Sequence, residues 1–142
     1  MISENDLRRF VGPQQRQYEQ ALREITAGRK RSHWMWYIFP QMRGLGYSSN
    51  AHYYGICDLD EAEAYLADSY LGGNLCRICE ALLELETDDA YAVFGSPDDM
   101  KLQSSMTLFA HAAGGYSVFH EVLDKFYDGR QCRATNRMLG IE

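Results

Sequence analysis

Apolar residues recur at helical spacing between glycine and proline along most of this chain, and this periodicity constrains the fold most. In residues 13–28, for example, the apolar positions from Tyr18 to Ile25 fall at i, i+3, i+4 and i+7, on one helix face. No stretch alternates apolar and polar residues for long enough to predict a strand. The sequence therefore predicts an all-α fold, a single compact bundle of about seven short helices, with residues 1–142 as one helical domain.

Turn and cap residues predict where the helices begin and end. Pro13 is typical of a first helical turn, and Gly28 is typical of the position just past a helix end. Ser96 and Pro97 predict the start of another helix, as N-cap and first helical residue, and this helix is expected to stop at Gly114.

Charge is distributed unevenly along the chain. The 142 residues are 46% hydrophobic and 24% charged, which is typical of a globular protein, and the formal net charge is −6. Residues 1–47 hold eight basic and four acidic residues, whereas residues 48–142 hold six basic and sixteen acidic ones. An acidic chain binds duplex nucleic acid poorly, because that affinity comes from neutralised phosphates. A local positive site on an acidic body instead favours a small anionic ligand.

Several classes of protein are excluded or disfavoured. No window approaches the roughly 20 continuous apolar residues of a membrane span, and the N-terminus is too polar for a secretory signal. We therefore expect a cytoplasmic protein with reduced cysteines and no membrane partner. Cys76 and Cys79 form a C-x-x-C pair, but no second pair completes a zinc site. The sequence predicts neither a metal nor a cofactor.

The segment over residues 32–41, SHWMWYIFPQ, crowds four aromatic side chains into six positions. No single helix or strand face can hold them all. One interpretation is a plug in the core, because aromatic rings carry a large apolar area. The other is the wall of a ligand pocket, in which indole rings stack on a flat ligand. The candidate ligand-binding residues in and beside this segment are Lys30, Ser32, Trp34, Trp36 and Gln41, with His33 as the candidate catalytic general acid–base.

The loop after this segment and the helix expected over residues 98–109 supply the rest of the predicted site. The loop glycines can bring backbone N–H groups to an anion, although a turn that needs positive φ explains them as well. Without a preceding strand they do not indicate a dinucleotide fold. Lys101 and Ser105 lie one turn apart beside the apolar stripe of their helix, so they can either rim a cavity or form a solvated face. The further candidate ligand-binding residues are Arg43, Gly44, Gly46, Ser48, Asp99, Lys101, Ser104 and Ser105.

Two pieces of the chain carry a specific resemblance. GRKRSHWMWYIFPQ at residues 28–41 and FGSPDDMKLQSSMTLF at residues 94–109 resemble the bacterial domain-of-unknown-function family number 1810, and the match runs nearly end to end. The resemblance implies a mainly α-helical single domain and no agreed activity. Some members carry a calpastatin-like label, but inhibitors of that kind are disordered, whereas this composition is globular. Cys132 stands where an aspartate is common, so any role of that acid would be missing here.

Together these patterns favour a cytoplasmic helical protein with a pocket for a small anionic, nucleotide-like ligand, built where residues 30–48 meet residues 98–109. One alternative is a protein–protein interaction module that exposes the aromatic segment 32–41 as its hot spot. Another is an N-glycosidase-like enzyme acting on ADP-ribose-type substrates, which needs a carboxylate beside an oxocarbenium-like centre. The sequence leaves open whether the protein is an enzyme.

Overall fold

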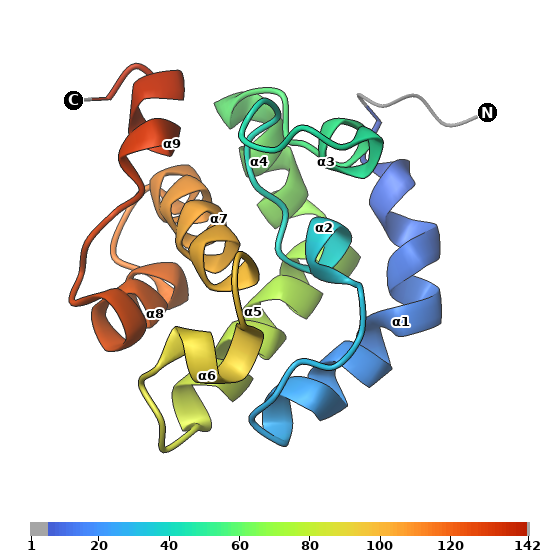
Figure 1. The fold of residues 1–142 in the computed structure, drawn as a ribbon. Helices are drawn as coiled ribbons and strands as arrows, with labels where there is room; N and C mark the ends of the chain where they lie inside the picture. The colour runs from blue at the N-terminus through green and yellow to red at the C-terminus, as the bar shows by residue number, and fades with distance from the viewer. Residues whose placement is uncertain (1–5, 142) are drawn as a thin grey trace.

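The computed structural model describes residues 6–141, and within them the chain forms nine α-helices and one isolated β-bridge (Figure 1). The helices are α1 (Arg8–Thr26), α2 (Met35–Ile38), α3 (Ser49–Tyr53), α4 (Leu59–Ala67), α5 (Ser69–Glu84), α6 (Ala90–Phe94), α7 (Asp98–Ala113), α8 (Val118–Tyr127) and α9 (Arg133–Met138). The all-α prediction is confirmed. The expected number of helices is too low because α2 and α3 have only four and five residues, too few to show a helical period. Within the same residues, no helix is both long and apolar enough to cross a membrane.

Helix α7 occupies the middle of the fold. It packs against α4, α6, α8 and α9, and Figure 1 shows it between the α4–α5 pair and the C-terminal helices. All of its residues from 104 to 110 are buried. A helix covered on several sides does not need a single apolar stripe. The polar side chains beside the expected stripe of α7 are therefore not all free to face a cavity.

The first helix begins earlier than the sequence predicts. It starts at Arg8, so Pro13 lies inside the helix rather than in its first turn. The preceding turn is held by Phe10, which is fully buried, and by Arg9, whose guanidinium lies 2.8 Å from the buried Glu61 carboxylate. These contacts outweigh the backbone hydrogen bond that an interior proline removes.

The ends of α7 follow the prediction only in part. Pro97, rather than Ser96, is the N-cap, and the helix begins one residue later than expected, at Asp98. At the other end the helix stops after Ala113, as predicted. Gly114 then adopts φ +79°, the left-handed conformation that glycine tolerates best.

The aromatic segment divides between the core and the surface. Trp34 and Phe39 are almost completely buried, and their ring centroids lie 6.2 Å apart. Trp36 and Tyr37, on α2, are only half-buried. The core interpretation therefore holds for the first pair, and Trp36 is left at the edge of the core.

The loop from residue 41 to residue 48 joins α2 to α3 and is fixed at both ends. Its first part pairs with Ile56 through two backbone hydrogen bonds of 2.9 Å. Near its end Gly46 lies so close to α3 that an added Cβ would come within 2.7 Å of the Ala51 Cβ. Ser48 then caps α3 by accepting the Ala51 backbone N–H at 3.0 Å. These contacts position the loop next to α7 and α9.

Candidate functional site

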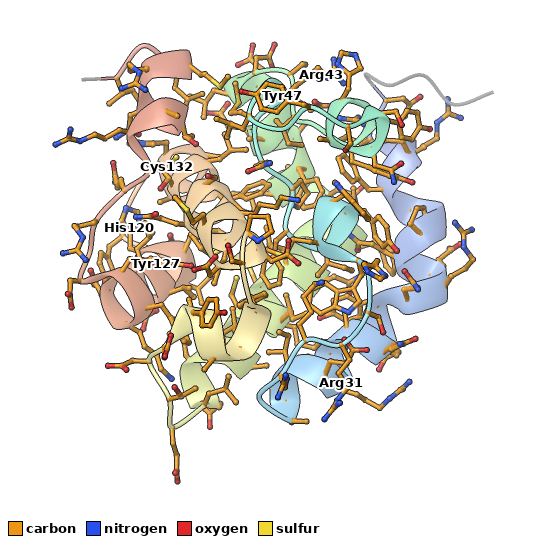
Figure 2. The ribbon with its side chains drawn as sticks, in the orientation of Figure 1. Arg31, Arg43, Tyr47, His120, Tyr127 and Cys132 are labelled. Carbon is orange, nitrogen blue, oxygen red and sulfur yellow. The ribbon has the colours of Figure 1, made fainter. Side chains whose placement is uncertain are left out.

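An open groove of about 500 Å³ lies between the loop of residues 41–48, the start of α3, the first turns of α7 and the start of α9; we call it the loop–α7 groove. Figure 2 labels two of its lining residues, Tyr47 from the loop and Cys132 from the start of α9. A crevice of about 10 Å³, room for about one water, adjoins it and extends to Trp36. The crevice and the groove share Gln41, Ala51 and Lys101. Both segments singled out in the sequence therefore contribute to one concavity.

Lys101 brings positive charge to this groove. Its ammonium lies 3.7 Å from the Asp98 carboxylate and 5.5 Å from the centroid of the Trp36 ring, and its side chain remains 26% exposed. Asp98 also pairs with Lys30 at 2.8 Å, and the Lys30 side chain is only 9% exposed. Two ammonium groups thus share one carboxylate. The excess positive charge is accessible at Lys101, because Lys30 is covered.

Six of the predicted site residues line the groove or the crevice. They come from α2, from the loop of residues 41–48 and from the first two turns of α7. These residues are Trp36, Gln41, Gly46, Ser48, Lys101 and Ser104.

Ser32 and Trp34 instead surround a buried carboxylate. Glu24 Oε1 accepts the Trp34 indole N–H at 2.9 Å, and its Oε2 accepts the Ser32 hydroxyl at 2.7 Å. Burial acts to raise the pKa of Glu24, but hydrogen bonds from Ser32, from the Arg31 backbone and from Trp34 outweigh it and lower the pKa to about 2. Trp34 has no exposed surface. The prediction that its ring stacks on a ligand is therefore wrong.

Three more predicted residues lie outside the lining of the groove. His33 is exposed to solvent, so its predicted role as general acid–base has no support from its position. The Arg43 guanidinium donates to the His52 carbonyl at 2.9 Å, which ties the loop to α3. Gly44 adopts φ +106° against α9, where an added Cβ would lie 2.9 Å from the terminal methyl of Met138. Arg43 and Gly44 shape the loop.

The predicted roles of Asp99 and Ser105 are also corrected. Asp99 accepts the neighbouring Met100 backbone N–H at 2.9 Å, and the carboxylate beside Lys101 is that of Asp98. Ser105 is fully buried, and its hydroxyl has no hydrogen-bond partner among the described residues. It faces the interior because α7 is covered on several sides, so it cannot contact a ligand in the groove.

Several lining residues were missed by the sequence reasoning, and two of them, Tyr47 and Cys132, carry polar functional groups. Tyr47 is 100% exposed at the edge of the groove. The sequence signal for Tyr47 was an aromatic residue among the glycines and serines of a loop. A loop of this kind is not expected to place an aromatic side chain in the core. Cys132 was noted only for the carboxylate that it replaces, and nothing in its local sequence predicts that α9 brings it to α7.

The Cys132 thiol has polar neighbours on α7 and α9. Its sulfur lies 3.3 Å from the Ser104 hydroxyl, and its backbone N–H donates to the Thr107 hydroxyl at 2.8 Å. Burial acts to raise the pKa of Cys132, but hydrogen bonds from the Ser104 hydroxyl and from the backbone N–H groups of Thr135 and Ala134 outweigh it, and the net shift is downward. By contrast, burial and the nearby Glu61 carboxylate raise the pKa of Cys57 to about 11.

The groove carries several charged and polar side-chain groups. These are one accessible ammonium, two serine hydroxyls, a glutamine amide, an exposed phenol ring and a thiol. Within the described chain, its lining includes no carboxylate and no histidine. Residues 6–141 also contain no group of three or more His, Cys, Asp or Glu placed to hold a metal ion.

Comparisons with known proteins support the fold but assign no activity to it. A family model described as "Protein of unknown function (DUF1810)" matches residues 4–139. The crystal structure of the conserved hypothetical protein Rv1873 from Mycobacterium tuberculosis is similar, with 44% sequence identity and a TM-score of 0.93. The match covers 97% of this chain and 99% of that one. No curated protein matches the chain.

Proposed function

The chain belongs to the DUF1810 family of proteins of unknown function, and we propose that it binds a small anionic ligand with a flat ring in the loop–α7 groove. The observation that carries the proposal is the position of Lys101. Its ammonium lies in the wall of an open groove and shares its carboxylate partner with Lys30. An incoming phosphate or carboxylate would complete the charge balance of Lys101 without separating Asp98 from Lys30.

The groove offers one aromatic partner for the ring of the ligand, and a second aromatic side chain lies in the adjoining crevice. Tyr47 presents a fully exposed phenol ring at the edge of the groove, and Trp36 lines the adjoining crevice. An aromatic side chain without tertiary contacts gains apolar burial when a flat ligand covers it. Gln41, between the two, supplies an amide that can donate or accept a hydrogen bond.

The size of the groove supports a small-molecule ligand. Its volume of about 500 Å³ falls within the roughly 300–1,000 Å³ typical of small-molecule sites. The lining combines apolar side chains such as Leu45 and Met100 with a few polar groups, which is the usual composition of such a site.

The two alternatives receive less support. The aromatic segment keeps Trp34 and Phe39 in the core, so little of it remains as an exposed hot spot for a protein partner. The N-glycosidase alternative needs a carboxylate at the reacting centre, and no carboxylate lines the described part of the groove.

A thermal-shift and calorimetric titration tests the proposal. The probes are AMP, ADP-ribose and ribose 5-phosphate, with adenosine as the neutral control. An anion at 100 times its Kd adds about 2.7 kcal/mol of stability to the wild-type protein. Lys101→Met, which keeps the aliphatic chain beside Trp36, is expected to weaken the binding of a phosphate-bearing probe at least about tenfold, since it removes a charge-assisted hydrogen bond.

The matched control is Arg23→Met, which removes one positive charge from an exposed position in the last turn of α1. It is expected to leave the affinity unchanged. Equal affinities of the wild-type protein and Lys101→Met would refute the assigned role of Lys101. No stabilisation by any anionic probe would contradict the proposal as a whole.

A further inference from the structure

We propose that Cys132 is an oxidation site within the loop–α7 groove, where a small peroxide converts its thiol to a sulfenic acid. The thiol is partly exposed in the lining of the groove, so a molecule of that size can reach the sulfur. None of the other cysteines lines the groove. A reaction at Cys132 would therefore change the groove directly.

Two hydroxyl groups are placed to support an oxygen on this sulfur. The Ser104 hydroxyl lies 3.3 Å from Cys132 Sγ and 3.2 Å from the Met100 carbonyl, so its one hydrogen can serve either acceptor. The Thr135 hydroxyl, in the first turn of α9, is a second donor close to the thiol. Both can donate to an oxygen that is added to the sulfur.

The Thr135 hydroxyl is an independent indication of such an added group. It is fully buried, and it makes no hydrogen bond of ordinary distance and angle with any described residue. A buried hydroxyl without a partner costs stability. An oxygen carried by Cys132 Sγ would give this hydroxyl the acceptor that it lacks.

The chemical step balances with a peroxide as the oxidant. The thiol releases its proton, and the thiolate sulfur attacks one peroxide oxygen. A sulfur–oxygen bond forms and the oxygen–oxygen bond breaks, so the sulfur loses two electrons and the peroxide gains them. The departing hydroxide takes up one proton and leaves as water. The product is the sulfenic acid of Cys132.

The oxidation regulates ligand binding if the proposed function is correct. Ser104 and Lys101 lie one turn apart on α7, and both line the groove with Cys132. An added oxygen on the sulfur occupies space in the groove and engages the Ser104 hydroxyl. We therefore expect oxidised protein to bind AMP more weakly than reduced protein. The weaker binding of AMP rests on the proposed function, whereas the oxidation itself does not.

Sulfenic acid trapping in the folded protein tests the inference. The protein is treated with a few equivalents of hydrogen peroxide in the presence of dimedone, and the label at each cysteine is quantified by peptide mass spectrometry. Cys57 is the internal control, because it is exposed but lacks the two hydroxyl donors. We expect Cys132 to be labelled at least about tenfold faster than Cys57, with the thiolate as the reactive form. Faster labelling of Cys57 would overturn the inference.

Substitutions test the oxidation of Cys132 independently of ligand binding. Ser104→Ala and Thr135→Val are each expected to slow the labelling of Cys132 severalfold, and Cys57→Ser is expected to leave it unchanged. If neither hydroxyl substitution changes the rate, the arrangement described above is refuted. If oxidation leaves the affinity for AMP unchanged, only the expected regulation of ligand binding is overturned. Oxidation of Cys132 in a protein whose reduced form binds none of the anionic probes would refute the proposed function and leave the oxidation site standing.

Discussion

Replacement of Glu24 by glutamine is expected to destabilise the protein strongly at neutral pH and much less in acid. Glu24 is 9% exposed and accepts hydrogen bonds from Trp34, from Ser32 and from the Arg31 backbone. A glutamine of nearly the same shape keeps one oxygen acceptor but carries no charge. The substitution therefore removes the charge-assisted strength of these bonds with little change in packing.

The size of the effect follows from the pKa of Glu24. Its pKa is about 2 in the folded protein, against an ordinary value of 4.5. Each pH unit between the folded and unfolded values corresponds to about 1.4 kcal/mol, so the charged carboxylate contributes roughly 3 kcal/mol. Because the folded value is the lower one, this contribution is complete above the unfolded pKa and is lost as the pH falls toward 2. At pH 3 only about 1.4 kcal/mol remains.

Urea denaturation at pH 7, pH 5 and pH 3 measures this contribution. We expect Glu24→Gln to lower the free energy of unfolding by about 2–3 kcal/mol at pH 7, and the difference from wild type to shrink by at least half at pH 3. Glu19→Gln, at an exposed position of the same helix, is the control and should change the stability by less than about 0.5 kcal/mol. A difference that stays constant between pH 7 and pH 3 would refute the assignment of the stabilisation to the charged carboxylate.

Two further predictions concern the packing of the helices. Arg9→Met leaves the Glu61 carboxylate buried without its ion-pair partner, so we expect a loss of about 3–5 kcal/mol in urea denaturation, partly recovered when Glu61→Leu is added. Gly72→Ala places a Cβ 2.2 Å from the Leu66 carbonyl oxygen and should lower the melting temperature, whereas Gly73→Ala meets no atom within 4 Å and should raise it slightly. Equal melting temperatures of the two alanine variants would show that the approach of α5 to Leu66 is not tight.

The fold was predictable from the sequence because its longer helices carry clear apolar periods and cap residues. The errors arose where tertiary contacts override local signals. Pro13 marks a helix start in isolation, but the burial of Phe10 and the ion pair of Arg9 extend α1 back beyond it. Helices α2 and α3 were missed because they have only four and five residues, too few to show a helical period.

The candidate site was predictable in part, for similar reasons. Helical spacing predicted Lys101 and Ser104 as neighbours, and both line the groove. It could not exclude Ser105, because only the packing around α7 determines which of its faces are covered. Nor does the sequence show which of Trp34 and Trp36 is buried. The first is buried because its indole reaches Glu24 on α1, a contact that no local pattern reveals.

An NMR titration of ¹⁵N-labelled protein with AMP tests the central claim most directly, because it locates the ligand without any substitution. The account predicts that the largest amide shifts cluster around the groove, at Gly46, Tyr47, Lys101 and Ser104. Shifts centred instead on the depression between α1 and α5, around Gln15 and Arg77, or no shifts at millimolar AMP, would contradict it.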